Sequence, residues 1–208
     1  MNFLEKYGLK IILILFLTFS YSIIAETKKL LILGDSISAG YGIKESENWV
    51  RLLETSLKRD SFDIDIVNSS VSGDTTIGGL SRIKNDLDQY SPDLVLIELG
   101  GNDALRGYPI KQIKSNLNKI IDECIKAGST PIIMQIRIPP NYGKNYVQAF
   151  ESIYPEIAEE NNLKLLSFLL QEVALRKDLM QLDGIHPNAN AQPTIANQVR
   201  QELLDVLK

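Results

Sequence analysis

Apolar residues along this chain gather in five short runs, with stretches of helical spacing between them. The runs are Leu30–Leu33, Ile64–Val67, Leu94–Leu99, Ile132–Ile136 and Leu163–Leu166. Continuous apolar residues, as in the first run and in Leu94–Ile97, are typical of strands covered on both faces, whereas the alternation in Asp63–Val67 indicates an edge strand. The pattern therefore predicts five strands, one of them at an edge.

The intervening stretches carry apolar stripes that predict amphipathic helices. One stripe consists of Ile110, Ile113, Leu117, Ile120, Ile121 and Cys124, and another of Ile195, Val199, Leu203 and Val206. Pro193 suits the start of the last helix. Alternating strands and helices favour a parallel sheet with right-handed crossovers. We predict an α/β, flavodoxin-like three-layer sandwich: a five-stranded parallel sheet of order 2-1-3-4-5 with helices on both faces.

Residues 1–25 differ in character from the rest. Lys6 and Lys10 precede an uncharged run from Ile11 to Ala25, which is shorter than the ~20 residues of a membrane span. This arrangement predicts a secretory signal peptide cleaved after Ala25 or Ser22, and an uncleaved anchor is the alternative. We expect a single domain over residues 26–208 in a periplasmic or secreted protein.

Charge and the single cysteine and histidine constrain the function. The chain has 208 residues and a net charge of −4 without a basic run, which argues against a nucleic-acid partner. Its only cysteine, Cys124, lies on an apolar stripe, and we expect a buried structural thiol. Its only histidine is His186, so any mechanism that needs an imidazole must use that residue.

Residues able to do chemistry follow the predicted strands. Ser36 comes just after the first strand, Gly73 after the second, Asn102 after the third, and "DGIHPN" lies beyond the fifth. Ligands bind at the carboxyl ends of strands in such sheets, so we expect these positions to meet on one rim. The longest loop that we expect is "RIPPNYGKN", residues 137–145.

Ser36 and His186 are candidates for a nucleophile and its base. A serine hydroxyl needs an adjacent base, and Asp183, three residues before His186, can orient the imidazole. Gly73 can bring a backbone N–H close to a substrate, and the Asn102 amide can donate to a developing oxyanion. The alternatives are a helix cap at Asp35 or Ser36, a surface histidine in a turn, and simple turns at Gly73 and Asn102.

Together these residues resemble a known family. Gly34-Asp35-Ser36, Gly73, Gly101-Asn102-Asp103 and the Asp183 to His186 segment fall in the order of the four signature blocks of the SGNH, or GDSL-type, hydrolases. The longer stretches "LGDSISAGYG", "VSGDTT", "ELGGNDALRG", "MQIRIPPNYG", "IYPEIA" and "DGIHPNANAQPTIA" resemble the exported multifunctional thioesterase/protease/lysophospholipase group. The resemblance runs from Leu30 to about Gln201, and Ile37 replaces the leucine of the GDSL name.

The resemblance implies a role for each of these positions. Ser36 is the nucleophile, His186 the base and then the acid, and Asp183 orients His186. The oxyanion hole consists of the Ser36 and Gly73 backbone N–H groups and the Asn102 side chain. The family implies hydrolysis of thioesters, aryl esters and lysophospholipids. We expect a monomer that acts on small-molecule substrates with neither cofactor nor metal.

The substrate side is inferred from apolar residues near the rim. They are Ile77, Leu105, Tyr108, Pro139, Pro140, Tyr142 and Ile185, which together favour an acyl chain over a sugar, with ordinary packing as the alternative for each. Two other functions stay open. One is a carbohydrate O-deacetylase on the same triad. The other is a Mg²⁺-dependent phosphatase or ligand-binding module that uses Asp35, Asp74, Asp103 and Asp183.

Overall fold

A parallel sheet organises the computed structural model, which describes residues 27–207. The strands are β1 (Lys28–Gly34), β2 (Ile64–Asn68), β3 (Leu94–Glu98), β4 (Thr130–Met134) and β5 (Lys164–Leu166). Their order is β2-β1-β3-β4-β5 and every pairing is parallel. The predicted α/β fold and strand order are therefore confirmed, including the edge position of β2. The predicted signal peptide lies outside the described residues.

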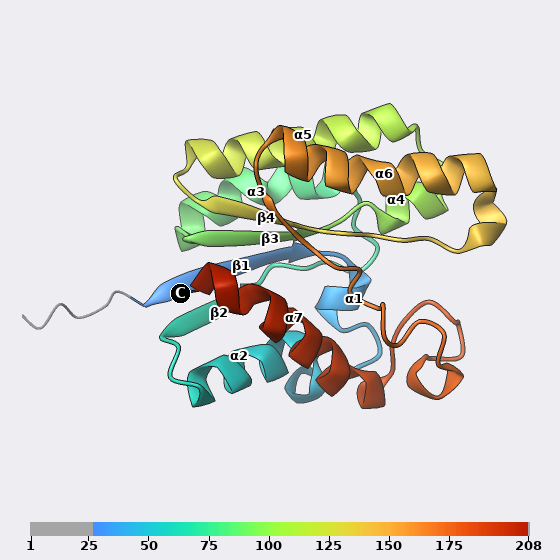
Figure 1. The fold of residues 1–208 in the computed structure, drawn as a ribbon. Helices are drawn as coiled ribbons and strands as arrows, with labels where there is room; N and C mark the ends of the chain where they lie inside the picture. Colours follow the sequence, from blue (N-terminus) through green and yellow to red (C-terminus); the bar gives the residue numbers. More distant parts are fainter. Residues whose placement is uncertain (1–26, 208) are drawn as a thin grey trace, which may run out of the picture.

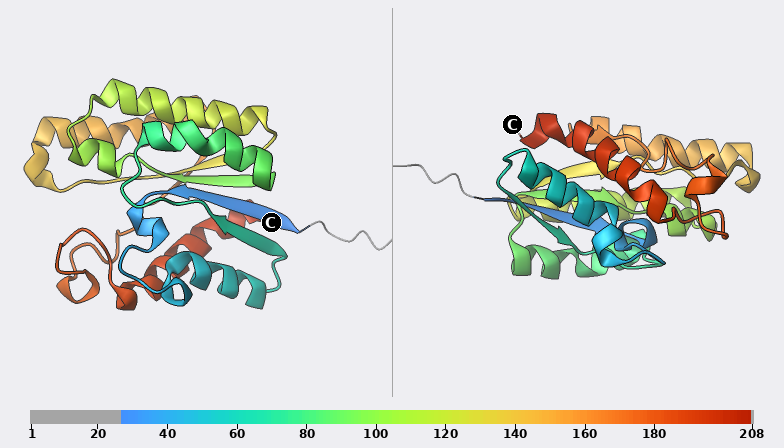
Figure 2. Two further views of the ribbon diagram at one scale, coloured as in Figure 1. Left: turned by 180° about the vertical axis from the view of Figure 1, so that it is seen from behind. Right: turned by 90° about the horizontal axis from the view of Figure 1, so that it is seen from below.

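Helices cover both faces of the sheet (Figures 1 and 2). The α-helices are α1 (Ser36–Ala39), α2 (Trp49–Arg59), α3 (Thr76–Tyr90), α4 (Gly101–Leu105), α5 (Ile110–Lys126), α6 (Lys144–Glu160) and α7 (Gln192–Leu207). Short 3-10 turns are η1 (Glu45–Glu47), η2 (Pro140–Tyr142), η3 (Lys177–Leu179) and η4 (Ala189–Ala191). Helices α2 and α7 lie on one face, and α3, α5 and α6 lie on the other. Within residues 27–207, no helix combines the length and apolar character needed to cross a membrane.

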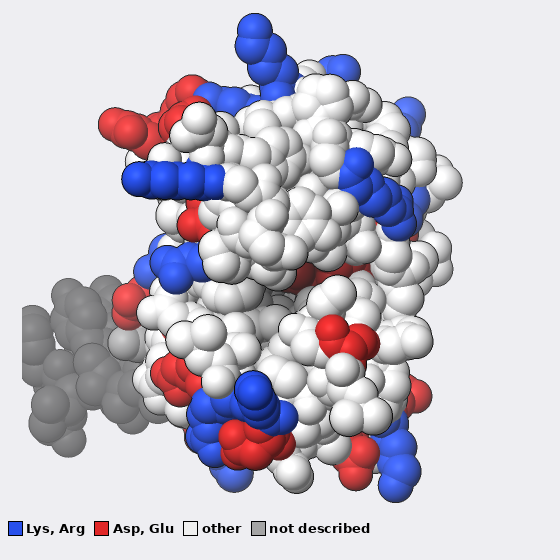
Figure 3. Space-filling view, turned by 90° about the vertical axis from the view of Figure 1, so that its right-hand side faces the viewer, with Lys and Arg blue, Asp and Glu red and all other residues white. Residues whose placement is uncertain are grey.

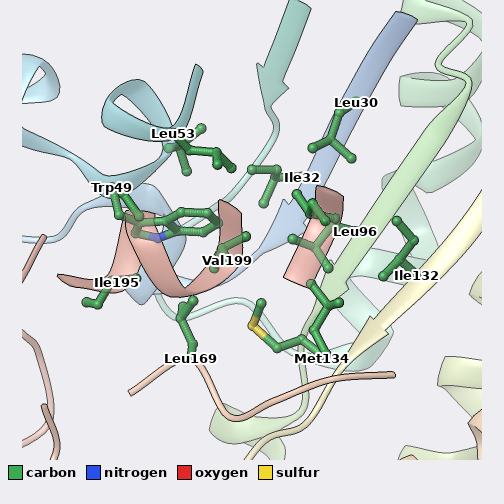
Figure 4. Close-up of a cluster of buried hydrophobic side chains, with 14 of the residues drawn as sticks. Leu30, Ile32, Trp49, Leu53, Leu96, Ile132, Met134, Leu169, Ile195 and Val199 are labelled. Atoms are coloured by element: carbon green, nitrogen blue, oxygen red, sulfur yellow. The ribbon is translucent and has the colours of Figure 1, made fainter. Parts of the chain in front are cut away.

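The continuous apolar runs arise because alternate strand residues serve opposite faces of the sheet. Leu30 and Ile32 of β1 pack with Trp49 and the α2/α7 side (Figure 4), whereas Leu31 and Leu33 pack on the α3/α5/α6 side. All five side chains are completely buried. A strand between two helical layers needs an apolar residue at every position, which is the pattern that β1 and most of β3 show.

Two details differ from the sequence-based expectations. The apolar runs extend past the strands, so Leu99, Ile136 and Leu163 lie outside β3, β4 and β5. The longest connection without an α-helix or a strand is residues 167–191, so the expectation for residues 137–145 is wrong. Leu169, Leu170, Val173 and Leu179 anchor residues 167–191 in the core, although this segment forms neither an α-helix nor a strand.

The sheet has its switch point beside β1. The chain passes from β1 to β2 through α2 on one face and from β2 to β3 through α3 on the other. Strands β1 and β3 are neighbours, and Gly34 at the end of β1 pairs with Glu98 at the end of β3. The segments that follow these two strands, α1 and α4, therefore start side by side, at the place where ligands bind in doubly wound sheets.

Candidate active site

Ser36 is the first residue of α1, and only Asp35 separates it from β1. Asp35 caps this helix, because its carboxylate accepts a hydrogen bond from the Ile37 N–H at 3.0 Å. The helix ends after one turn at Gly40, which has a φ of +76°. The capping alternative is thus correct for Asp35, and the half-buried Ser36 hydroxyl is left for another partner.

That partner is the only imidazole of the chain. His186 Nε2 lies 2.8 Å from Ser36 Oγ, and His186 Nδ1 lies 2.7 Å from Asp183 Oδ2. The backbone N–H of His186, its imidazole and the Ile185 N–H lower the pKa of Asp183 to about 2. A charged carboxylate next to Nδ1 selects the tautomer with a proton on Nδ1, which leaves Nε2 free to accept the serine proton.

Local hydrogen bonds hold the segment that carries Asp183 and His186. Asp183 Oδ1 accepts from the backbone N–H groups of Ile185 and His186, at 2.9 and 3.0 Å. Gln181 donates its backbone N–H to the His186 carbonyl at 2.8 Å. The Gln181 side chain donates to the carbonyls of Tyr41 and Pro187, at 2.8 and 3.0 Å. This side chain therefore ties the histidine segment to the loop that follows α1.

Tyr41 also contacts the imidazole directly. The centroids of the Tyr41 and His186 rings are 4.6 Å apart, and their planes are tilted by 39°. Sequence reasoning missed both Tyr41 and Gln181. Neither residue carries a signal of its own in the sequence, because each acts through a contact between segments about 140 residues apart.

Possible oxyanion donors lie on the segments after β1, β2 and β3. Gly73 adopts a φ of +80°, which favours glycine, and Arg106 donates to its carbonyl at 3.1 Å. Asn102 lies in α4, and its Nδ2 donates to Asp35 Oδ2 at 3.0 Å. The N–H groups of Ser36 and Gly73 take no part in the backbone hydrogen bonds of residues 27–207. The predicted rim residues are thus on neighbouring segments of one edge, which Figure 3 shows as a hollow with acidic side chains at its floor.

A buried carboxyl group lies beneath α1. Glu98 is 2 % exposed, and its Oε2 accepts from the Ser38 hydroxyl at 2.7 Å and from the Asp35 N–H at 3.3 Å. Burial and the neighbouring Asp35 raise the pKa of Glu98 well above its usual range. Burial also raises the pKa of Asp35 to about 6. Sequence reasoning missed Glu98, although one acidic residue ending the apolar run "LVLIE" was a usable signal.

The carboxylates considered as a metal site serve separate partners. Asp74 pairs with Arg82 at 2.9 Å, and Asp103 accepts from the Thr76 hydroxyl and N–H at 2.6 and 2.9 Å. Asp35 and Asp183 make the contacts described above. Residues 27–207 contain no group of three or more His, Cys, Asp or Glu side chains placed to hold a metal ion. The geometry therefore gives no support to the Mg²⁺ alternative.

The apolar residues expected near the substrate fall into two sets. Ile77, Tyr142 and Ile185 are exposed, at 48 %, 38 % and 45 %. Pro139 and Pro140 are exposed in and beside η2. Leu105 and Tyr108 are half-buried and pack against the core under α5 and α6, so part of their surface is buried by ordinary core packing. A role in binding an acyl chain stays a prediction for all of them.

The fold and the site geometry define a serine hydrolase of the SGNH class, and the chain belongs to the GDSL-like Lipase/Acylhydrolase family, which matches residues 32–192. It is 49 % identical over 178 residues to an arylesterase of Vibrio mimicus, covering 86 % of this chain and 89 % of that protein. It is 43 % identical over 205 residues to the thioesterase 1/protease 1/lysophospholipase L1 of Escherichia coli K12. This match covers 98 % of this chain and 96 % of that protein.

A solved structure supports the same assignment. The psychrotrophic esterase EstA from Pseudoalteromonas sp., in a structure inhibited by monoethylphosphonate, superposes with a TM-score of 0.84 at 41 % identity. The match covers 86 % of this chain and 98 % of that one. The predicted family, and with it an esterase or thioesterase function, is therefore confirmed.

Proposed function

We propose that this enzyme hydrolyses acyl esters and thioesters of the lysophospholipid, aryl ester and acyl-CoA type through a Ser-His-Asp triad and an acyl-enzyme intermediate. The observation that carries the proposal is the continuous hydrogen-bonded chain Ser36–His186–Asp183, with distances of 2.8 and 2.7 Å. Serine needs an adjacent base to become an effective nucleophile, and here the base and its orienting carboxylate lie on one short turn.

The acylation step follows from this geometry. Ser36 Oγ bonds to the acyl carbon while its proton passes to His186 Nε2. The imidazolium that forms is stabilised by Asp183, whose pKa of about 2 keeps it ionised. The bond to the leaving alcohol or thiol then breaks, and His186 returns the proton to the leaving oxygen or sulfur. Water, activated by the same imidazole, attacks the acyl-enzyme and releases the carboxylic acid and free Ser36.

Negative charge develops on the acyl oxygen in both steps. The proposed donors are the backbone N–H groups of Ser36 and Gly73 and the Asn102 amide, which come from three different segments of the rim. Donors that are aimed in advance at the developing charge stabilise the transition state more than the bound substrate. We therefore assign these groups to the oxyanion hole.

The proposed substrate class rests on the rim and on the relatives. Exposed apolar side chains at Ile77, Tyr142 and Ile185 suit a hydrocarbon chain better than a sugar. The relatives described above carry the names arylesterase and thioesterase/lysophospholipase. Both observations favour acyl esters over the acetylated carbohydrate of the deacetylase alternative.

A series of p-nitrophenyl esters of increasing chain length tests this substrate class. We expect kcat/KM to rise from acetyl to a longer acyl chain, because each added CH₂ that leaves water contributes about 0.8 kcal/mol. An acetylated xylan fragment serves as the matched substrate for the alternative. A steady preference for acetyl esters, with rapid deacetylation of the sugar, would instead assign the enzyme to carbohydrate deacetylation.

Tyr142 provides a variant that separates binding from chemistry. The Tyr142→Ala change removes an exposed aromatic ring from η2 and touches none of the triad. We expect a loss of activity on long-chain esters that exceeds the loss on p-nitrophenyl acetate. Equal losses at every chain length would argue against contact between Tyr142 and the acyl chain.

We also propose that the enzyme is exported to the periplasm or secreted. The support is the sequence of residues 1–25, in which Lys6 and Lys10 precede a short apolar run. N-terminal sequencing of the protein recovered outside the cytoplasm should begin just after Ala25 or Ser22. A chain that still begins at Met1 would contradict the proposal.

A further inference from the structure

Asp35 makes two contacts that the proposed mechanism does not use. One carboxylate oxygen accepts the Ile37 N–H at 3.0 Å and so caps the helix that carries the nucleophile. The other oxygen accepts a hydrogen bond from Asn102 Nδ2 at 3.0 Å. A single side chain, 5 % exposed, therefore joins the nucleophile's helix to the side chain assigned to the oxyanion hole.

The chemistry of the partner decides which end of the Asn102 amide faces Asp35. A carboxylate can only accept hydrogen bonds, so it attracts the NH₂ group and repels the carbonyl oxygen. Nδ2 has two N–H bonds; one is directed to Asp35 and the second is left for another acceptor. In the flipped amide, Oδ1 would face the carboxylate and Nδ2 would leave its present place.

Glu98 and Ser38 hold the Asp35 segment from below. Glu98 Oε2 accepts from the Asp35 N–H and from the Ser38 hydroxyl. A Cβ atom at Gly34 would lie 2.8 Å from Glu98 Oε2 and 2.8 Å from Ser70 Oγ, so only glycine leaves room for this packing. Burial raises the pKa of both carboxyl groups, that of Asp35 to about 6 and that of Glu98 well above its usual range.

We propose that Asp35 is a positioning residue: its carboxylate fixes the orientation of the Asn102 carboxamide so that Nδ2 stays available as an oxyanion donor. The inference rests on the oxyanion role given to Asn102 in the proposed function. It parallels the action of Asp183 on His186, since in both cases a carboxylate selects one of two states of a neighbouring side chain.

Two substitutions at position 35 distinguish this role from a merely structural one. Asp35→Asn is nearly isosteric, but its Oδ1 is needed to cap Ile37, so its NH₂ group faces Asn102 and favours the flipped amide. Asp35→Ser retains a capping oxygen and is too short to reach Asn102, which leaves both amide orientations accessible. A structural role predicts that the larger change, to serine, is the more harmful.

We expect the opposite order in kcat on p-nitrophenyl butyrate. Asp35→Asn should lower kcat by about 10²–10³-fold, the loss typical of one oxyanion donor, with KM changed less than about threefold. Asp35→Ser should lower kcat by about tenfold. Thermal unfolding of each variant establishes that the rates belong to folded protein. If Asp35→Asn does not fold, the test is the double-mutant cycle of Asp35→Ser with Asn102→Ala.

The decisive measurement is a double-mutant cycle with Asn102→Ala. In the Asn102→Ala background the substitution at position 35 has no amide to misdirect, so it should change kcat by less than about threefold. A loss of the same size in both backgrounds would overturn the inference, as would a wild-type rate in folded Asp35→Asn. Asn102→Ala with a wild-type rate would contradict the oxyanion assignment itself, and the inference with it.

Discussion

The two halves of the proposed triad are held in place by different means. Only Asp35 separates Ser36 from β1, in which Leu30 to Leu33 are fully buried, and the buried Ser38 lies two residues further on. Asp183 and His186 lie in the segment 167–191 after β5, on a turn that also contains the exposed residues Leu182 and Ile185. Burial fixes the nucleophile, whereas hydrogen bonds to backbone groups fix the base.

This difference predicts how substitutions divide between activity and stability. Segments that are exposed and rely on local hydrogen bonds open at lower free energy than core strands do. Changes in the Asp183–His186 turn should therefore alter kcat with little effect on the free energy of unfolding. Changes around β1 and Glu98 should affect both.

The largest effect is expected from removing the base or the nucleophile. His186→Ala and Ser36→Ala should each lower kcat on a p-nitrophenyl ester by about 10⁴-fold or more, and the double variant should be no slower. The two losses do not add because the residues act as one unit. Retention of more than about a tenth of wild-type activity in folded His186→Ala, a barrier change of under about 1.4 kcal/mol, would exclude its role as general base.

The second effect concerns the orienting carboxylate. Asp183→Asn retains the shape of the turn but removes the charge that selects the Nδ1-protonated tautomer. The known precedent on another fold is a drop in kcat of about 10⁴-fold, and we expect a loss approaching that size. Because the Asp183 side chain is 39 % exposed and lies outside the core, the thermal unfolding midpoint should change little. A large drop in that midpoint would show that Asp183 has mainly a structural role.

A smaller effect on kcat is expected from Gln181, whose side chain connects the histidine segment to the loop after α1. Gln181→Ala removes the side-chain hydrogen bonds to the carbonyls of Tyr41 and Pro187, so His186 should sample positions farther from Ser36. We expect kcat to fall about three- to tenfold. The matched control is Gln198→Ala, which removes a side-chain hydrogen bond to the Phe168 carbonyl. Equal rates in the two variants would contradict a role for Gln181 in placing the histidine.

The buried carboxyl groups near Ser36, those of Glu98 and Asp35, predict that the free energy of unfolding depends on pH. The pKa of Glu98 is raised well above its usual 4.5 by burial, so the folded protein retains a proton that the unfolded chain has lost. The contribution of Glu98 to the free energy of unfolding is therefore fully present below about pH 4.5, and it decreases as the pH rises. Asp35, with a pKa of about 6 against the usual 3.8, acts in the same direction.

Glu98→Gln tests this sign, because glutamine has a similar shape and does not titrate. Urea unfolding of both proteins should show a free-energy difference that shifts in favour of the variant between pH 5 and pH 8. The difference should grow over that range, because the folded protein holds a proton on Glu98 that the unfolded chain has lost. A difference that is the same at both pH values would contradict the raised pKa of Glu98.

The smallest effect on activity is expected at Cys124. Burial among the apolar residues of α5 raises the pKa of its thiol to about 12, so it is neither a nucleophile nor a ready target for alkylation. Cys124→Ala should reduce stability modestly and leave kcat within about twofold of wild type. Loss of esterase activity in a well-folded variant would assign the thiol a role that its position does not suggest.

The sequence alone was sufficient to predict the fold, and it named the groups that we propose as the triad. Buried strands between two helical layers need apolar residues on both faces, so Leu30–Leu33 and Leu94–Ile97 identify themselves as strands. A lone His186 three residues after Asp183, with Ser36 directly after a strand, limits the chemistry to few choices. Each of these signals involves residues that are close together along the chain, so it can be recognised from the sequence alone.

The tertiary structure decided what lies beneath and beside those groups. Glu98 under α1, the Asp35–Asn102 hydrogen bond and the Gln181 contact to Tyr41 join segments that are 60 or more residues apart. The order of strands and helices does not specify such pairings, because each depends on the placement of individual side chains. Residues 167–191 could not be predicted for a related reason: they are held by core contacts and single hydrogen bonds, which leave no periodic pattern along the chain.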